Sequence, residues 1–107
     1  MSRLPSFYEE FCASYPAVAG AYAQLGDACR EAGPLDHKSA ELVKLALSIA
    51  AGAEGGAHSH ARRALAAGAT GDELAHIALL AITTLGFPRA MTGLAWIRDV
   101  VDAPAKT

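Results

Sequence analysis

Glycine and proline residues interrupt this chain at short intervals, and between them the apolar residues recur with helical spacing. No segment shows the strict alternation of a half-buried strand. The chain is therefore predicted to be all-α, a compact bundle of about six short helices. Their expected ranges are about 4–15, 16–31, 37–52, 57–67, 71–85 and 89–101.

Several helix starts carry residues that favour them. Pro16 suits a first helical position, and Asp36 is a good N-cap. Thr70 with Glu73 forms a capping-box pattern. The run Glu54-Gly55-Gly56 is expected to break the chain before the fourth helix.

Length and charge limit the classes of function. The 107 residues predict a single domain over 1–107, and a net charge of −2 gives no basic surface for nucleic acid. No apolar run approaches the roughly 20 residues that span a bilayer, so no membrane partner is expected. Acidic residues near the start replace the apolar core of a signal peptide, which favours a cytoplasmic location.

The third and fifth predicted helices are apolar almost all round. In the third helix a narrow polar line is formed by Glu41, Lys44 and Ser48. Helices of this kind are usually internal to a fold or to an assembly. With 52% of the residues apolar in so short a chain, we expect a homo-oligomer.

Cys12 and Cys29 lie far apart in sequence and form no metal or redox motif. Each is expected to be a small buried residue.

Glu41 and His60 are the strongest candidates for chemistry. Both border apolar stripes, so both could face one pocket between two helices, where a carboxyl group and an imidazole can exchange a proton near neutral pH. A second interpretation stays open: Glu41 pairs with Lys44 on a solvated helix edge, and His60 is an ordinary core histidine.

His58 and His60 are two residues apart, which places them about 200° apart around a helix. They cannot both bind one ion, so no metal site is expected. Arg62 and Arg63 fall on the side away from the apolar stripe, as solvated or subunit-contact residues. The Gly55-Gly56 pair either breaks the chain or offers bare amides to a substrate carboxylate, with His58 beside them.

Four segments together resemble the carboxymuconolactone decarboxylase and alkylhydroperoxidase D-like superfamily. They are Glu41-Leu-Val-Lys-Leu-Ala-Leu-Ser-Ile-Ala-Ala-Gly, His60-Ala-Arg-Arg-Ala-Leu-Ala-Ala-Gly-Ala-Thr, Glu73-Leu and Gly86-Phe-Pro-Arg-Ala. The resemblance implies a six-helix fold, a family-like core over about 36–101, and assembly as a homotrimer or hexamer.

In the peroxidase branch of this superfamily, a Glu precedes a Cys-x-x-Cys-x-x-x-His motif. Glu41 and His60 match its Glu and its terminal His, whereas the cysteine positions fall on Ala53 and Gly56. Thiol-dependent peroxide reduction needs both sulfurs, so it is not expected here. The decarboxylase branch is similar in lacking the cysteine pair and in keeping a helical histidine and a Gly-x-Pro turn.

By this resemblance the chain is expected to be a cofactor-free lyase- or isomerase-type enzyme acting on a small carboxylated metabolite. Glu41 and His60 would transfer the proton, and Gly55, Gly56 and His58 would bind the substrate. Two further hypotheses are a non-catalytic oligomeric family member and a peroxidase-related activity using Cys12 or Cys29.

Overall fold

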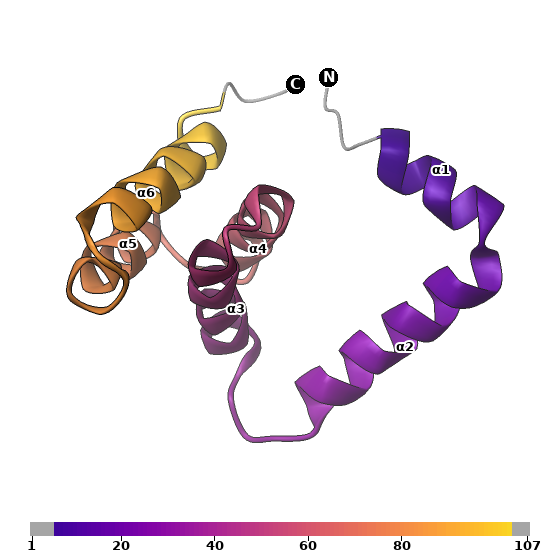
Figure 1. The fold of residues 1–107 in the computed structure, drawn as a ribbon. Coiled ribbons are helices and arrows are strands. Elements are labelled where there is room, and N and C mark those ends of the chain that lie inside the picture. Colours follow the sequence, from indigo (N-terminus) through magenta and orange to yellow (C-terminus); the bar gives the residue numbers. More distant parts are fainter. Residues whose placement is uncertain (1–5, 104–107) are drawn as a thin grey trace. The chain divides into compact units, whose positions relative to one another are not determined.

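The computed structural model describes residues 6–103, and these contain helices and no strand. The helices are α1 (Ser6–Ser14), α2 (Pro16–Glu31), α3 (His37–Ala51), α4 (Glu54–Ala66), α5 (Gly71–Leu85) and α6 (Phe87–Val101) (Figure 1). The all-α prediction with six helices is confirmed. The chain divides into two compact units, Met1–Pro34 and Leu35–Thr107. The assignment of 1–107 to a single domain stays a prediction.

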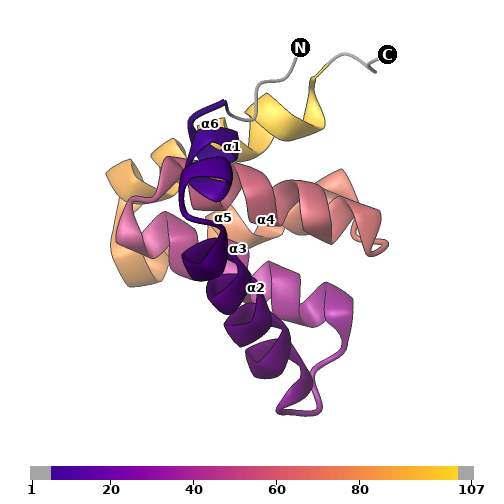
Figure 2. The same cartoon turned by 90° about the vertical axis from the view of Figure 1, so that its right-hand side faces the viewer.

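In the second unit, α3 packs against α4 and α5 against α6, and α4 also contacts α6 (Figure 2). Small residues allow these helices to approach closely. A Cβ atom at Gly93 of α6 would lie 2.6 Å from Ile49 Cγ2 of α3, closer than packed carbon atoms can come. The buried core consists mainly of Leu45, Ile49, Leu74, Ile97 and the alanines 57, 61, 64, 78 and 90.

The predicted caps are present. Asp36 accepts a hydrogen bond from the Ser39 amide at 2.8 Å, and the Ser39 side chain together with this amide lowers the pKa of the Asp36 carboxyl. At the start of α5 the Thr70 hydroxyl and the Glu73 carboxylate each accept the other's amide N–H at 3.0 Å. The bond from the Thr70 amide, with a second from Lys38 of α3, lowers the pKa of Glu73. Lys38 and Glu73 thereby link α3 to α5.

The predicted start of the fourth helix is wrong. We expected a break at Glu54-Gly55-Gly56, but α4 begins at Glu54 and both glycines lie in its first turn. The helix can start there because Ala53 serves as N-cap and its carbonyl accepts the Ala57 amide at 2.9 Å. Glu54 also places its negative charge at the positive end of the helix dipole. The sixth helix likewise begins earlier than predicted, at Phe87.

The outer faces of α3 and α5 are exposed within the chain, so these helices are not internal to the fold of one chain; that they are internal to an assembly stays a prediction. Val43 and Leu47 of α3, and Leu79 and Leu80 of α5, each expose 46% or more of their surface. The buried row of α3 is instead Glu41, Leu45 and Ile49, spaced four residues apart. Glu41 therefore does not belong to a polar line with Lys44.

The first unit is a pair of helices, α1 and α2, in contact with each other. The ring centroids of Phe11 and Tyr15 lie 5.6 Å apart with the rings tilted by 41°, and α2 contains no buried residue. Cys29 is exposed and Cys12 only half-buried, so the prediction that both are buried is wrong. Two short helices alone cannot enclose a core, which leaves apolar side chains uncovered: Phe7, Tyr8, Tyr15, Val18, Tyr22 and Leu25.

Residues 4 and 5 of the first predicted helix lie outside the described part of the chain. Within residues 6–103, no helix has both the length and the apolar character needed to cross a bilayer.

Candidate active site

Glu41 and His60 meet between α3 and α4. His60 Nδ1 lies 2.7 Å from Glu41 Oε1, within hydrogen-bond distance. The Glu41 side chain has no exposed surface, whereas His60 keeps 16% of its side chain exposed. Of the two interpretations left open, the shared position between helices is therefore the observed one. A Glu41–Lys44 pair on a solvated edge is wrong, because Glu41 lies in the buried row of α3.

The geometry assigns the two imidazole nitrogens different tasks. A carboxylate oxygen can only accept, so Nδ1 carries the hydrogen and donates a hydrogen bond to Glu41 Oε1. This fixes the ring orientation and leaves Nε2 as the nitrogen that can meet a reactant. A carboxylate behind an imidazole also stabilises the imidazolium that forms when Nε2 takes up a proton. The pair is thus suited to moving one proton to or from a small molecule.

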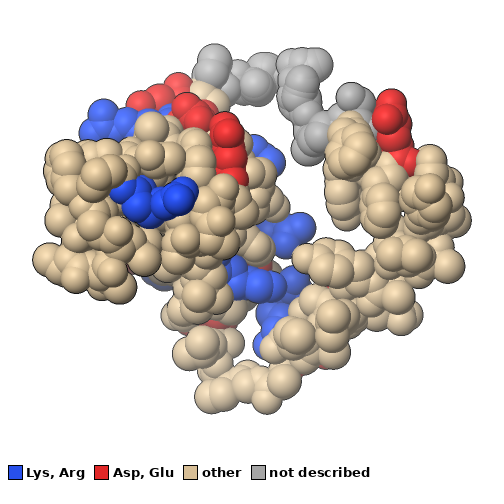
Figure 3. All heavy atoms as spheres, viewed as in Figure 1, with Lys and Arg blue, Asp and Glu red and all other residues tan. Residues whose placement is uncertain are grey.

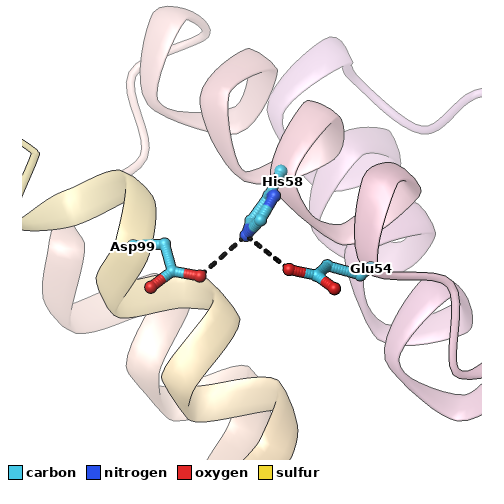
Figure 4. A group of neighbouring side chains, drawn as sticks. All are labelled: Glu54, His58 and Asp99. Atoms are coloured by element: carbon cyan, nitrogen blue, oxygen red, sulfur yellow. Dashed lines mark hydrogen bonds and ion pairs between the residues drawn. The ribbon is translucent and has the colours of Figure 1, made fainter. Parts of the chain in front are cut away.

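His58 points to the other side of α4, as its spacing from His60 predicted. Its Nε2 lies 2.9 Å from Asp99 Oδ2 of α6 and 4.0 Å from Glu54 Oε2, one turn earlier on α4 (Figure 4). Sequence analysis missed both acids. Because we expected a break at Glu54, its spacing of four residues from His58 was not used, and Asp99 comes close only through the packing of α4 on α6.

A surface cavity of about 400 Å³ lies on the side of α4 that carries His58. Arg62, which we expected on the outer face of the helix, lines it. The cavity is therefore next to His58 and not next to the Glu41–His60 pair. Its walls are formed by His58, Arg62, Leu65, Asp99, Val100 and Ala103.

The two positions that carry cysteines in the peroxidase branch lie at the start of α4. Ala53 is the N-cap residue and Gly56 faces Ser48 of α3. A Cβ atom at Gly56 would lie 3.7 Å from the Ala53 Cβ, within the span of about 3.5–4.5 Å that a disulfide bridges. It would also lie 2.8 Å from Ser48 Oγ, so Ser48 would have to move.

Arg89, a basic residue that was not among the predicted site residues, lies at the same turn between α3 and α4. The Arg89 guanidinium of α6 contacts the turn at Gly52, where an added Cβ would come within 2.8 Å of Nη1. Gly52 has a φ of +72°, which closes α3 in the left-handed conformation that glycine adopts most readily. The signal available in the sequence was its position directly after the Gly86-Phe87-Pro88 turn.

These features occur in a chain that matches a known family. The model of the carboxymuconolactone decarboxylase family covers residues 16–99. The chain therefore belongs to the carboxymuconolactone decarboxylase family, and the resemblance inferred from its sequence is confirmed. The match begins at Pro16, earlier than the family-like core that we expected at about 36–101. Neither the curated proteins nor the solved structures gave a match.

Proposed function

We propose that the protein is a cofactor-free lyase- or isomerase-type enzyme in which Glu41 and His60 transfer a proton on a small carboxylated metabolite. The observation that supports this is the 2.7 Å contact between a fully buried carboxylate and a partly exposed imidazole, in a decarboxylase family. A residue that served packing alone would not need to place a carboxylate in the core, where desolvation is costly.

The proposed lyase step needs only one proton from the protein. The bond between the substrate carbon and its carboxylate breaks, carbon dioxide leaves, and the electron pair is delocalised into a neighbouring carbonyl as an enolate. The His60 imidazolium then donates the Nε2 proton to that enolate, and Glu41 holds the ring through Nδ1. Water restores the His60 proton. For an isomerase step, Nε2 removes a proton from one carbon and returns it to another.

The carboxylate of the substrate is proposed to bind at the amides of Gly55 and Gly56. These amides belong to the first turn of α4, where they have no helical partner and the helix dipole favours an anion. His58 was expected to bind the same group. Because it points to the opposite side of α4 from His60, we assign it no part in the proton transfer.

The proposal is tested with a panel of carboxylated lactones and small oxo acids. Ligand-induced thermal shifts and turnover would be compared for wild type, His60→Gln and Glu41→Gln, with His76→Gln as a matched control because His76 is an exposed histidine of α5. Loss of a positioned general acid or base should reduce turnover about 10²–10⁴-fold. Equal shifts and equal turnover in wild type and His60→Gln would remove His60 from the site.

A second candidate function is supported by the surface. Figure 3 shows that residues other than Lys, Arg, Asp and Glu make up most of the face it presents, and Phe7, Tyr22 and Leu47 are more than 60% exposed. An assembly protein, forming a homotrimer or hexamer with an inactive pocket, would cover such groups. Light scattering would give the subunit number. An oligomer that binds none of the panel and turns none of it over would favour this role over catalysis.

A further inference from the structure

We propose that Glu54, His58 and Asp99 form a binding site for a divalent transition-metal ion, with Zn²⁺ as the best-fitting ion. Each residue offers one ligand atom, and these three atoms all lie within 4.8 Å of one another. Figure 4 shows His58 between the two carboxylates, with its Nε2 directed at both. This site is separate from the Glu41–His60 pair and does not depend on the function proposed for that pair.

The backbone holds the three ligands in place. Glu54 and His58 are four residues apart on α4, so they lie on the same face one turn above each other. Asp99 comes from α6, whose Ile97 is buried in the same core as Ala61 of α4. All three ligands therefore stand on packed helices, and little backbone order has to be created when an ion binds.

The distances suit an ion after a small movement of one side chain. Zn²⁺ binds imidazole nitrogen and carboxylate oxygen at about 2.0–2.2 Å, so its ligand atoms lie about 3–3.5 Å apart. His58 Nε2 and Asp99 Oδ2, now 2.9 Å apart, are already near that spacing. Glu54 Oε2 lies 4.0 Å from Nε2, and its side chain is 60% exposed, so a rotamer change can bring it in.

The donor set selects the class of ion. One imidazole and two carboxylates supply the mixed nitrogen and oxygen ligands that Zn²⁺ accepts, and the two negative charges balance its charge. Ca²⁺ needs six to eight oxygen ligands, and Mg²⁺ is rarely bound by imidazole. The fourth position would face water at the cavity beside His58, as in zinc sites that keep one position open.

Two features of the surroundings disfavour binding of the ion. In its absence the His58 ring donates a hydrogen bond to Asp99, and a metal must replace that proton. Arg62 also lines the cavity beside Asp99, and its positive charge repels a cation. Arg62 is exposed, so solvent screens this repulsion, and its removal should tighten binding.

The test is titration of the full chain with Zn²⁺ by calorimetry, in a Cys12→Ser, Cys29→Ser background so that thiols cannot bind the ion. We expect one ion per chain. Loss of a residue that hydrogen-bonds to a metal ligand typically weakens a metal site about 10–100-fold, so His58→Ala and Asp99→Asn, which remove direct ligands, should weaken it at least as much. Matched controls are His76→Ala and Asp72→Asn, which change an exposed histidine and an exposed aspartate of α5.

Co²⁺ in place of Zn²⁺ gives a second readout, since its visible absorption bands report the number and geometry of its ligands. Circular dichroism would show that each variant keeps its helices. Zn²⁺ affinity equal in wild type and His58→Ala, or no saturable binding at millimolar Zn²⁺, would overturn the proposal. Glu41→Gln should leave the affinity unchanged, so failure of the proposed enzyme and failure of this site can be told apart.

Discussion

Truncating either partner of the Glu41–His60 hydrogen bond should destabilise the folded chain, and the two effects should not add. The bond is 2.7 Å long and one end is a carboxylate with no exposed surface. Hydrogen bonds to charged groups contribute about 1.5–3 kcal/mol. Breaking a fully buried ion pair costs about 3–5 kcal/mol, but His60 keeps 16% of its side chain in water, so the lower range applies.

A double-mutant cycle isolates this interaction. His60→Ala and Glu41→Ala each remove the same bond, and the double variant loses it only once. The loss of unfolding free energy in the double variant should therefore be smaller than the sum of the single losses by about 1.5–3 kcal/mol. Glu41→Ala should be the more costly single change, because it also leaves unfilled volume in the buried row of α3.

The free energies would be measured by urea unfolding followed by far-UV circular dichroism. One protein concentration is needed throughout, because self-association would make stability depend on it. His76→Ala, an exposed histidine of α5, should change stability by no more than about 0.5 kcal/mol. Single-variant losses that add to within about 0.5 kcal/mol would refute the reasoning, since uncoupled residues behave in that way.

Three further predictions concern packing, pH and the family's dithiol. Gly93→Ala should destabilise the chain by about 1–3 kcal/mol in the same urea assay, because its Cβ would lie 2.6 Å from the buried Ile49. Gly20→Ala, in the middle of α2, should stabilise the chain by about 0.5–1 kcal/mol, because no atom lies within 4 Å of the added Cβ. The folded state lowers the pKa of Glu73 from its ordinary 4.5, so the stability that this carboxylate contributes is complete above that pH and is lost as the pH falls through the lowered pKa. Glu73→Gln should therefore flatten the acid side of a plot of stability against pH. Ala53→Cys with Gly56→Cys, in a background without the native cysteines, should form a disulfide on mild oxidation, because the two Cβ atoms would be 3.7 Å apart; two free thiols by titration would contradict this.

The helices could be predicted from the sequence because their ends depend on local chemistry. Asp36 and the Thr70–Glu73 pair satisfy backbone amides within one turn, and both caps are present as predicted. The start of α4 could not be predicted in this way. Glycine there was interpreted as a break, but Gly56 allows the close approach of Ser48 of α3, a contact that depends on how α3 and α4 pack together.

The candidate site, like the helix ends, could be predicted only in part from the sequence. Helical spacing separated His58 from His60, and the structure gives them partners on different helices. Spacing alone could not decide whether Glu41 faces His60 or Lys44, because both lie within reach of a residue at the edge of an apolar stripe. The packing of α3 on α4 decides it. Asp99 was not identifiable at all, since its role depends on the approach of α6 to α4.

The contact between Glu41 and His60 is present in a chain that has no cysteine at positions 53 and 56. The dithiol positions lie at the short turn that joins α3 to α4, where Gly56 allows Ser48 to come close. Along α3, Ser48 and Glu41 are seven residues apart, which is about two helical turns. Glu41 lies in the buried row of α3, whereas the atoms nearest to a Cβ at position 56 belong to Ser48 and Ala53. The absence of cysteines at positions 53 and 56 therefore removes the thiol pair one helical turn before His60 on α4 and leaves the contact between His60 and Glu41 in place.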